Sequence, residues 1–518
     1  SGLPGADRLA AVTPGALVLV GFMGAGKTTA ARALAEGLEA EAVDADELLE
    51  ARLGMPIARF FDERGETAFR AQEEAAVLEL LERGDPVVIA LGGGAVTSAA
   101  VREALGAHRV LWLDVGVEQA WARAAGQDRP LARDRERFAS LHAERLPLYE
   151  AVADALVPAA AVDRALPALV AWAGSPPGTQ LVWATSPSAE YPVFAGEGLV
   201  EAGFYPVEGR RFLVTDGQVA RWYAGLLKPT MGSAMVMPGE ASKTVAHAEI
   251  VWTEMANAGV TRDDHVTALG GGVVGDLAGF CAATYQRGIR LVGVPTTLVA
   301  QVDSAYGGKT GVDLVEAKNY VGAYHQPAAV ITDPATLRTL PAEELSAGYA
   351  EVVKTALIAG GELWERVRTR ATDGTDLDTI VACARTKLAV VAADERDAGE
   401  RQVLNLGHTV AHAIETTTGY TRYRHGEAVA LGLLAALRLS GQDELRQEVA
   451  ALFDRHGLPL HLDGDVDLEA VELATARDKK RRGEAPVPFV LIEAPGSVSH
   501  GNPVEPDALR AALTELAP

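Results

Sequence analysis

The sequence contains only two cysteines, Cys281 and Cys383, among its 518 residues. So few cysteines exclude a disulfide framework and are typical of a protein that works in a reducing compartment such as the cytoplasm. Long hydrophobic runs are also missing, because the most apolar stretch, 9–26, is interrupted by Pro14 and four glycines and no basic segment precedes it. We therefore expect neither a membrane span nor a targeting segment.

Positive charge is scarce: 47 lysines and arginines stand against 70 aspartates and glutamates, which gives a formal net charge of −23. Such a chain repels phosphate backbones and anionic lipids, so we expect no nucleic-acid partner and no membrane partner. With 48% hydrophobic and 23% charged residues, the composition is that of a globular protein. At about 100–200 residues per domain, the length predicts three or four folding units.

A short uncharged segment rich in glycine and proline separates two stretches that carry their own motifs. We expect a linker at 174–180, one domain at 1–173, a second at 181–333 and a third at 334–518.

The hydrophobic pattern predicts the fold class of each domain. Short apolar runs alternate with helical patterns in the first two domains, at 16–20, 87–90, 110–113, 212–215, 266–269 and 291–294. This alternation is typical of α/β folds in which helices cover both faces of a parallel sheet. Beyond Pro334, amphipathic patterns such as 344–359 and 428–439 predict a mostly helical domain.

A phosphate-binding loop follows the first apolar run. Residues 21–28 read G-x-x-x-x-G-K-T and lie between a predicted strand and a predicted helix. Glycines such as Gly24 and Gly26 let backbone N–H groups surround phosphates, Lys27 adds a positive charge, and the Thr28 hydroxyl can hold Mg²⁺. A glycine-rich turn without a nucleotide is the alternative.

The loop fixes the phosphate donor, so other residues must select the acceptor. Asp44 and Asp46 lie two apart after a short strand, a spacing that turns both carboxylates to one face, one for Mg²⁺ and one for an acceptor proton. Alone, the pair would more often be a solvated acidic turn. Further motifs accompany it, namely G-E-T-A-F-R at 65–70, G-G-G-A at 92–95, R-P-L at 129–131 and R-x-x-x-Y at 145–149.

Together these motifs resemble the shikimate kinase family over nearly the whole first domain. The resemblance implies ATP and Mg²⁺ as cofactors, with Asp46 as the base, Arg70 and Arg145 on the shikimate carboxylate, and Arg129 on a lid. Two arginines suit a planar carboxylate because guanidinium groups donate parallel charge-assisted hydrogen bonds. It also implies contacts to the substrate from Gly92, Gly93 and Gly94, to the nucleotide from Thr29, and to Mg²⁺ from Asp44.

The second half contains candidate dinucleotide and metal sites. Gly270, Gly271 and Gly272 follow an apolar run, although a tight turn without a ligand explains their spacing equally well. His408 and His412 share one helix face and His425 follows, so with Glu351 they offer a donor set of the kind that holds catalytic Zn²⁺. For each histidine alone, a hydrogen-bonded core position is the commoner reading.

Cationic residues recur in motifs across this half, which is unusual in so acidic a chain. They are Arg287, Lys309, Lys318, Lys354, Lys387, Arg401, Lys479 and Lys480. If they converge, they suit a substrate that carries both a phosphate and a carboxylate. Scattered surface charge is the alternative.

These motifs resemble the 3-dehydroquinate synthase family over about 181–500, including G-G-G-V-x-G-D, Q-V-D-S, A-E-V-V-K and L-N-x-G-H-T-x-x-H. The resemblance implies a homodimer that converts 3-deoxy-arabino-heptulosonate 7-phosphate to 3-dehydroquinate and phosphate with transient reduction of NAD. It implies Zn²⁺, with Co²⁺ as an alternative, on Glu351, His408 and His425. The NAD residues implied are Asp216, Glu240, Lys243, Gly271, Gly272, Val273, Asp276, Thr296, Thr297, Asp303, Lys318, Thr339 and Leu340. The catalytic and substrate residues implied are Arg287, which reaches a neighbouring subunit, and Asp303, Lys309, Asn319, Lys354, Lys387, Arg401, Asn405, His412 and Lys480.

Four positions depart from the family pattern. Asp397 stands where glutamate is usual, Gln218 replaces asparagine, Ala317 replaces glycine, and Tyr306 replaces a smaller residue. These changes bear on rate and cofactor affinity more than on reaction class. The competing readings are a gluconate-type kinase fused to a glycerol-dehydrogenase-like protein, and a chain in which one half has become a binding module.

Overall fold

The computed structural model describes residues 15–83, 87–124, 134–314, 317–476 and 488–518. The chain divides after Trp183 into two compact units, and the stretch 192–194 groups with the first. The segment 174–180, expected as a linker, therefore lies inside the first unit.

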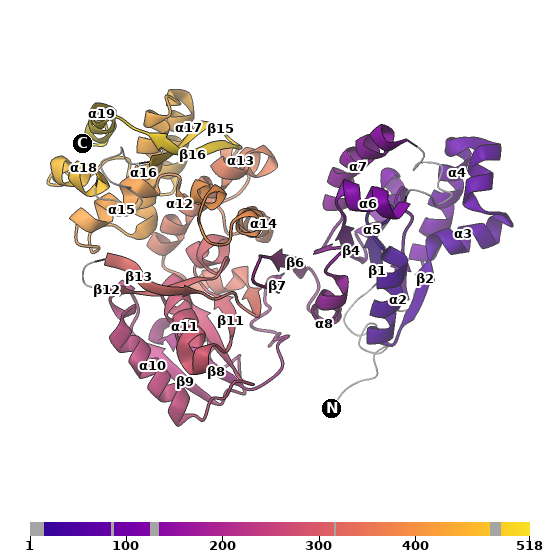
Figure 1. Ribbon diagram of the computed structural model, residues 1–518, viewed down its shortest axis with the longest axis horizontal. Helices are drawn as coiled ribbons and strands as arrows, with labels where there is room; N and C mark the ends of the chain where they lie inside the picture. Colours follow the sequence, from indigo (N-terminus) through magenta and orange to yellow (C-terminus); the bar gives the residue numbers. More distant parts are fainter. Residues whose placement is uncertain (1–14, 84–86, 125–133, 315–316, 477–487) are drawn as a thin grey trace. The chain divides into compact units, whose positions relative to one another are not determined.

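The first unit is built on a parallel sheet, drawn from indigo to purple in Figure 1. Its strands are β1 (Leu17–Val20), β2 (Glu41–Asp44), β3 (Val87–Ala90), β4 (Arg109–Asp114), β5 (Ala155–Pro158) and β6 (Gln180–Thr185), in the order β2-β3-β1-β4-β5-β6. Every residue of β1 and β3 is buried, which explains why these strands read as unbroken apolar runs.

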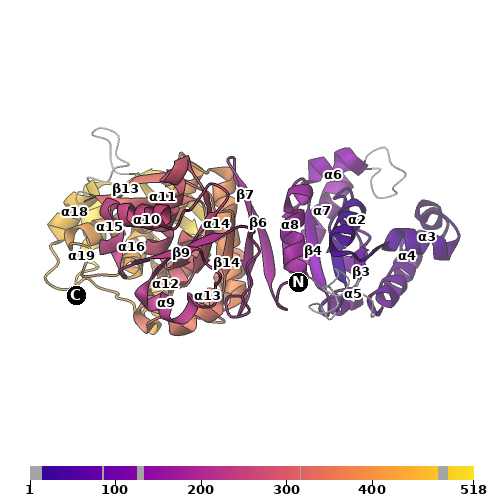
Figure 2. The same ribbon diagram turned by 90° about the horizontal axis from the view of Figure 1, so that it is seen from below.

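Helices connect these strands, as the alternating pattern predicts (Figure 2). They are α2 (Lys27–Leu38), α3 (Ala45–Leu53), α4 (Ile57–Leu81), α5 (Ala99–Leu105), α6 (Val117–Ala124), α7 (Arg135–Glu150) and α8 (Val162–Ala173). Helix α4 bends at Gly65, whose φ of 81° is left-handed, so the turn that carries Arg70 is set at an angle to the start of the helix.

The first part of the second unit is built on parallel strands of a β-sheet. Its strands are β8 (Arg211–Asp216), β9 (Gly232–Val236), β10 (His265–Gly270), β11 (Arg290–Pro295) and β14 (Ala329–Thr332), in the order β14-β11-β10-β8-β9. Its helices are α9 (Gly217–Tyr223), α10 (Val245–Asn257) and α11 (Gly272–Thr284). An antiparallel hairpin of β12 (Lys309–Leu314) and β13 (Ala317–Tyr324) lies between this sheet and the C-terminal helices (Figure 1). The short strand β7 (Glu190–Ala195) precedes β8 in the chain.

The C-terminal part of this unit is mostly helical, as predicted. Its helices are α12 (Ala342–Ala359), α13 (Gly361–Arg368), α14 (Leu377–Ala393), α15 (His408–Thr417), α16 (His425–Leu439), α17 (Asp443–Arg455), α18 (Leu468–Ala476) and α19 (Pro506–Thr514). One large buried apolar cluster joins α12, α15 and α16. The hydrophobic pattern missed one hairpin here, β15 (Pro488–Ala494) with β16 (Ser497–Pro503), because β16 has no buried residue and shows no apolar alternation.

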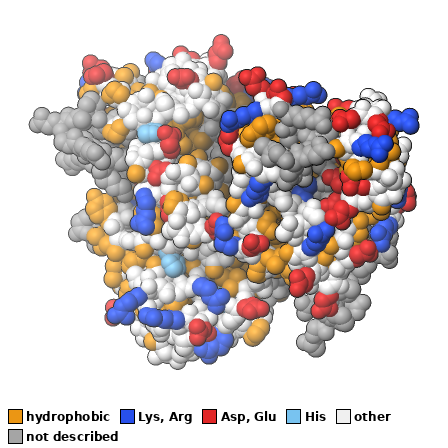
Figure 3. Space-filling view, turned by 45° about the vertical axis from the view of Figure 1, so that its right-hand side comes forward, with side chains coloured by type: hydrophobic (Ala, Val, Ile, Leu, Met, Phe, Trp, Pro, Cys, Tyr) orange, Lys and Arg blue, Asp and Glu red, His pale blue; other side chains and the backbone are white. Residues whose placement is uncertain are grey.

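The described surface carries charges of both signs, interspersed over the face drawn in Figure 3. Among the described residues, no helix combines the length and the apolar character that a bilayer span requires. Both cysteines are buried.

Candidate active sites

The phosphate-binding loop, residues 21–28, connects β1 to α2. Gly24 and Gly26 have φ of 82° and 83°, a conformation that glycine adopts without strain. Lys27 Nζ donates to the carbonyl oxygens of Gly21, at 2.9 Å, and Phe22, at 3.2 Å. The loop therefore curves around the ammonium group, and the first turn of α2, which holds Thr28 and Thr29, presents its N–H groups where a phosphate gains most from the helix dipole.

Two oxygens suited to Mg²⁺ lie together beside this loop. Thr28 Oγ1 donates to Asp44 Oδ2 at 2.5 Å, and Asp44 Oδ1 accepts from the N–H groups of Asp46, at 2.9 Å, and Glu47, at 3.3 Å. Asp44 thus caps α3, and Asp46 lies in the first turn of that helix. The expected strand spacing of the two aspartates is wrong, because the chain enters a helix at Ala45.

Gly92, Gly94 and the side chains around them form the centre of the candidate acceptor site. A Cβ atom at Gly92 would lie 2.6 Å from Asp46 Oδ1, and one at Gly94 would lie 2.7 Å from Arg70 Nη2. Arg70 also pairs with the buried Glu73, from Nη1 to Oε2, at 2.5 Å. A side chain at either position would therefore have to displace Asp46 or Arg70 from its place beside the tripeptide 92–94.

Gly93 links the acceptor residues to the phosphate loop. Its carbonyl oxygen accepts from Arg145 Nη1 at 3.1 Å and from Tyr149 Oη at 2.5 Å. A Cβ atom at Gly93 would lie 3.1 Å from the backbone nitrogen of Met23 in the phosphate loop. The structure therefore brings the expected acceptor and donor residues to one place. Arg129 lies outside the described residues.

The second unit contains a cavity of about 1280 Å³. It is lined by nearly all the residues expected for NAD, the metal and the substrate, namely Asp216, Glu240, Lys243, Gly271, Gly272, Val273, Asp276, Thr296, Thr297, Asp303, Lys309, Lys318, Asn319, Thr339, Leu340, Glu351, Lys387, Asn405, His408, His412 and His425. This cavity lies where the carboxyl ends of the parallel strands face the helical part, the usual ligand position in α/β sheets.

Residues at the ends of β8 and β10 shape the dinucleotide side of the cavity. Asp216 ends β8 and caps α9, accepting from the N–H groups of Gln218, at 2.8 Å, and Val219, at 3.0 Å. A Cβ atom at Gly271 would lie 2.8 Å from Thr297 Cγ2, and one at Gly272 would lie 3.0 Å from Ser304 Oγ. Backbone N–H groups at the start of α11 are therefore open to a close approach by a pyrophosphate.

Three donors from three helices form the candidate metal centre. Glu351 lies on α12, His408 begins α15 and His425 begins α16, and their ligand atoms lie within 4.8 Å of one another. Glu351 Oε1 is 3.2 Å from His425 Nε2 and 3.5 Å from His408 Nε2. His412 lies beside them, with its ring centroid 5.4 Å from that of His408.

Tight helix packing brings these donors together. A Cβ atom at Gly426 would lie 2.6 Å from Ala347 Cα on α12 and still closer to the Ala347 carbonyl. A Cβ atom at Gly432 would lie 3.0 Å from the backbone nitrogen of Ala411 on α15. Helix α16 therefore approaches α12 and α15 at backbone distance, which side chains at these two positions would prevent.

Charges around the metal centre keep its carboxylate ionised. Burial alone raises the pKa of Glu351, but Lys354, His408 and His425 together bring that pKa well below its ordinary value. Burial, reinforced by the Lys354 charge, lowers the pKa of His408. Burial opposes protonation of His425 too, but hydrogen bonds to Glu351 and Glu415 raise its pKa to about 9.

Cationic side chains converge at the cavity wall and directly behind it. Lys354 Nζ lies 2.5 Å from Glu351 Oε2 and 2.7 Å from Asp303 Oδ2, and Lys387 contacts the other oxygen of Asp303. Lys309 Nζ pairs with Asp397 Oδ2 at 2.5 Å. This convergence excludes scattered surface charge for Lys354 and Lys387, whereas Lys309 lines the cavity with a half-exposed side chain.

Comparison with known proteins identifies both units. Residues 23–166 match the family model for shikimate kinase, residues 233–347 the model for the N-terminal part of 3-dehydroquinate synthase, and residues 348–481 the model for its C-terminal part. The 3-dehydroquinate synthase of Symbiobacterium thermophilum is 43% identical over 351 residues, which are 63% of this chain and 98% of that protein. That of Halorhodospira halophila is 42% identical over 350 residues, 64% of this chain and 98% of that protein.

A solved structure also resembles the second unit. 2-Epi-5-epi-valiolone synthase from Streptomyces hygroscopicus, determined with NAD⁺ and Zn²⁺ bound, is 26% identical, with a TM-score of 0.58 over 63% of this chain and 97% of that protein. The chain belongs to the shikimate kinase family in its first unit and to the 3-dehydroquinate synthase family in its second. It is a bifunctional enzyme of the shikimate pathway.

Some expected residues of the synthase unit lie elsewhere. Arg401 does not line the cavity; its Nη1 and Nη2 donate to the carbonyl oxygens of Glu395, at 2.5 Å, and Gly307, at 3.0 Å. Lys354 lies behind Glu351 and Asp303 and is buried. Arg287 is exposed on a turn with a left-handed φ of 68° and is not among the residues that line the cavity. Lys480 lies outside the described residues.

Two of the four departures from the family pattern, Tyr306 and Asp397, have local structural explanations. Tyr306 is fully buried, and its hydroxyl donates to the Gln301 carbonyl at 2.8 Å, so the larger side chain fills core volume beneath the cavity. Asp397 has a left-handed φ of 59° and still reaches Lys309. Its shorter side chain therefore keeps the ion pair.

Sequence reasoning missed Glu415, a buried carboxylate that contacts both His425, a candidate metal donor, and Lys318 in the cavity wall. Burial alone raises the pKa of Glu415, but hydrogen bonding and charge from His425, with the Lys318 charge, lower it to about 2. Glu415 lies seven residues after His408, on the helix face that carries both histidines. The spacing rule that selected His408 and His412 would therefore have found it.

Proposed function

We propose that the kinase unit transfers phosphate from ATP to shikimate at the tripeptide 92–94. Arg70 and Arg145 lie on either side of this tripeptide and suit the shikimate carboxylate. Asp46 lies against Gly92 and suits the hydroxyl that receives the phosphate, because a positioned carboxylate can accept its proton. The observation that carries the proposal is that Asp46, Arg145 and Arg70 lie at Gly92, Gly93 and Gly94 in turn, with the phosphate loop beside Gly93.

The donor side of the kinase site follows from the loop geometry. Lys27, with the N–H groups at the start of α2, would hold the ATP phosphates, and Thr28 and Asp44 would hold Mg²⁺ directly or through water. Arg129 would close over the phosphates from its lid. Because positioning and charge stabilisation dominate phosphoryl transfer, these contacts account for most of the catalysis expected here.

We propose that the synthase unit holds Zn²⁺, or Co²⁺, on Glu351, His408 and His425 and binds NAD along the 271–276 loop. A set of two imidazoles and one carboxylate fits these ions and leaves coordination positions open for substrate. Gly271 and the first turn of α11 fit a dinucleotide, because Gly271 and Gly272 lie close to Thr297 and Ser304 and leave backbone N–H groups open to a pyrophosphate. When bound, NAD supplies reversible oxidation of the substrate alcohol and the metal polarises the substrate oxygens.

The remaining polar residues would bind 3-deoxy-arabino-heptulosonate 7-phosphate. Lys387 lines the cavity and Lys354 lies behind Asp303, so both place positive charge beside the cavity, and Lys309 adds charge at its edge. Arg401 would act indirectly, by fixing the turn that precedes Lys309. Asn319, Asn405 and His412 line the same cavity and would donate hydrogen bonds to substrate, with Lys480 as a further cation.

We further propose that the synthase unit forms a homodimer in which Arg287 reaches the partner's phosphate site, and that the enzyme works in the cytoplasm, as its two buried cysteines suggest. Mixing Arg287→Ala chains with His408→Ala chains tests the dimer. In a symmetric dimer, random exchange should restore phosphate release at roughly a quarter of the sites. No recovery after verified exchange would contradict the shared site.

The function is tested by assaying the purified chain with each substrate alone. ATP and shikimate should give ADP, and the heptulosonate phosphate should give phosphate without net NADH. The variant Arg70→Ala should lose shikimate use and keep phosphate release, and His408→Ala should do the reverse. Stoichiometric NADH accumulation would indicate a simple dehydrogenase instead.

A further inference from the structure

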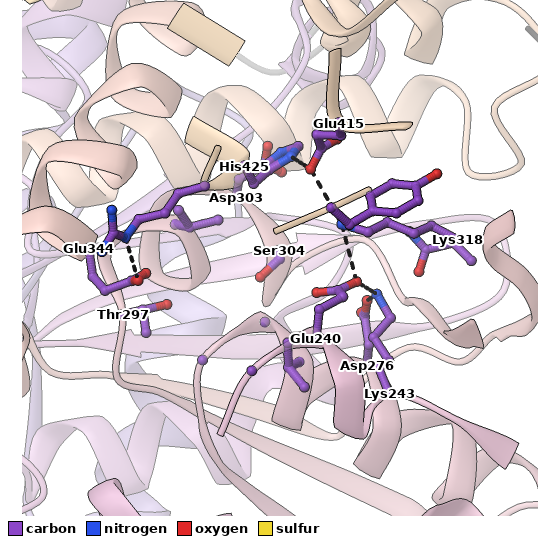
Figure 4. A pocket seen from close by; sticks show the side chains of 18 of the residues that line it. Glu240, Lys243, Asp276, Thr297, Asp303, Ser304, Lys318, Glu344, Glu415 and His425 are labelled. Atoms are coloured by element: carbon purple, nitrogen blue, oxygen red, sulfur yellow. Dashed lines mark hydrogen bonds and ion pairs between the residues drawn. The ribbon is translucent and has the colours of Figure 1, made fainter. Parts of the chain in front are cut away.

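A single buried carboxylate, Glu415, lies between the metal centre and the NAD pocket. Its side chain is 3% exposed, and Oε1 lies 3.4 Å from His425 Nδ1 and 3.3 Å from Lys318 Nζ. Figure 4 shows Glu415 between these two cations, which come from different parts of the unit: α16 of the helical part and the β12–β13 hairpin. One carboxylate oxygen therefore faces both groups.

The position of Glu415 determines how the His425 ring is presented. Nε2 of His425 faces Glu351, the proposed co-ligand, and Nδ1 faces Glu415. A histidine binds a metal through one nitrogen, and a carboxylate that accepts the proton of the other nitrogen fixes both the tautomer and the ring orientation. Glu415 is placed to do this for the nitrogen that His425 directs away from the metal.

The same carboxylate continues into the NAD pocket through a series of alternating charges. Lys318 Nζ lies 3.7 Å from Glu240 Oε1, which in turn lies 3.3 Å from Lys243 Nζ. Lys243 pairs with Asp276 at 2.8 Å. Figure 4 shows these contacts joined from His425 to Lys243. All the pocket members of this series line the cavity proposed to hold NAD.

Resting on the proposed metal and NAD sites, we infer that Glu415 is a positioning residue that orients His425 and Lys318 together and so couples metal binding to NAD binding. NAD that orders Lys318 and Glu240 also fixes Glu415, and a fixed Glu415 holds His425 in its ligating orientation. The coupling is reciprocal, because each ligand must change the affinity of the other by the same factor.

The first test is Glu415→Gln, which keeps the shape and one acceptor oxygen but removes the charge. Zn²⁺ and Co²⁺ affinity is measured by competition with a chromophoric chelator, and NAD affinity by quenching of protein fluorescence. Loss of such a carboxylate typically lowers metal affinity by about 10- to 100-fold. In the parent chain NAD should tighten metal binding by roughly fivefold or more, and this factor should fall toward one in the variant.

The second test removes the Lys318 side of the Glu415–Lys318 contact. Lys318 contacts no metal ligand directly in the described structure, yet Lys318→Met should weaken metal binding in the parent chain. It should have no further effect on metal binding in the Glu415→Gln background. Lys318 lies on a hairpin and its side chain is 24% exposed, so this variant also serves if Glu415→Gln does not fold.

Glu515→Gln is the matched control. This carboxylate is also held by two cations, Arg438 at 2.7 Å and Arg446 at 2.5 Å, but it lies away from the cavity. The control should leave both affinities and the coupling factor unchanged. The Co²⁺ absorption spectrum of Glu415→Gln should shift, since the His425 ligand is reoriented.

Two results would overturn the inference: metal affinity in Glu415→Gln within about twofold of the parent, well short of the about 10- to 100-fold loss usual for such a carboxylate, or independent binding of NAD and metal in the parent chain. These results differ from failure of the proposed function. If the parent binds neither NAD nor metal, the site assignments themselves are wrong, whereas parent binding with unchanged coupling in the variants would remove only the role of Glu415.

Discussion

Replacement of Gly426 by alanine should displace His425, a proposed metal ligand, without replacing any ligand residue. Gly426 follows His425 at the start of α16, and an alanine Cβ there would lie 2.6 Å from Ala347 Cα on α12. Carbon atoms in contact prefer about 3.5–4.0 Å, so the two helix backbones would have to separate by roughly 1 Å. Because Glu351 lies one helical turn beyond Ala347, the separation moves His425 away from its co-ligand.

The magnitude of the effect follows from how small a ligand displacement a metal site tolerates. Overpacking of this kind costs about 1–3 kcal/mol of folding stability. Metal–ligand distances are held to about ±0.2 Å, so a shift near 1 Å removes most of the contribution of His425. We expect Gly426→Ala to bind Zn²⁺ at least about tenfold more weakly, which is close to 1.4 kcal/mol, and to release phosphate correspondingly slowly at limiting metal.

The assay combines chelator competition, phosphate release and thermal unfolding on the same preparation, with kinase activity as an internal control. Gly225→Ala is the matched substitution, because nothing lies within 4 Å of a Cβ built there and its φ is not left-handed. Parental metal affinity in Gly426→Ala would refute the argument that close packing of α16 on α12 sets the ligand geometry.

Three further outcomes are expected. Arg70→Ala should raise the KM for shikimate with little change in the KM for ATP, and equal effects on both would argue against a carboxylate contact. Metal removal by a chelator, followed by excess Mg²⁺, should restore ADP formation but not phosphate release, and full recovery of both would contradict a Zn²⁺ or Co²⁺ requirement. The fragment 1–185 should melt above the fragment 1–173, because Arg109 donates to the carbonyl oxygen of Ser175 at 2.5 Å and β6 pairs with β5; equal melting temperatures would show that these contacts contribute nothing.

The sequence predicted the buried strands well and the paired surface strands poorly. The predicted run 87–90 has the same first and last residues as β3, because a parallel strand covered on both faces has an unbroken apolar sequence. The hairpin β15–β16 gave no such signal, because its second strand is stabilised by pairing with β15 and has no fully buried residue, although Val498 packs against the edge of the core.

For the site residues, sequence spacing predicted which side chains share a face of one helix. It did not predict contacts between different helices and strands. Helical spacing placed His408 and His412 on one face, and the structure puts both at the cavity. No spacing rule predicts that Arg401 would bond to backbone carbonyls or that Asp46 would enter a helix, because each depends on where the chain turns next. Contacts between distant segments, such as Glu415 with Lys318, require the fold itself.

Both units must bring site residues from separate segments together, and they do so by different means. The difference determines which substitutions would disrupt each site. In the kinase unit, the phosphate loop, Asp44 and the glycines at 92–94 all follow carboxyl ends of neighbouring strands, so one sheet positions them. In the synthase unit, strand ends form the proposed dinucleotide site, whereas the candidate metal donors lie on three helices. The proposed metal centre therefore depends on helix packing at backbone distance, and the proposed coupling depends on Glu415, which contacts both His425 and Lys318.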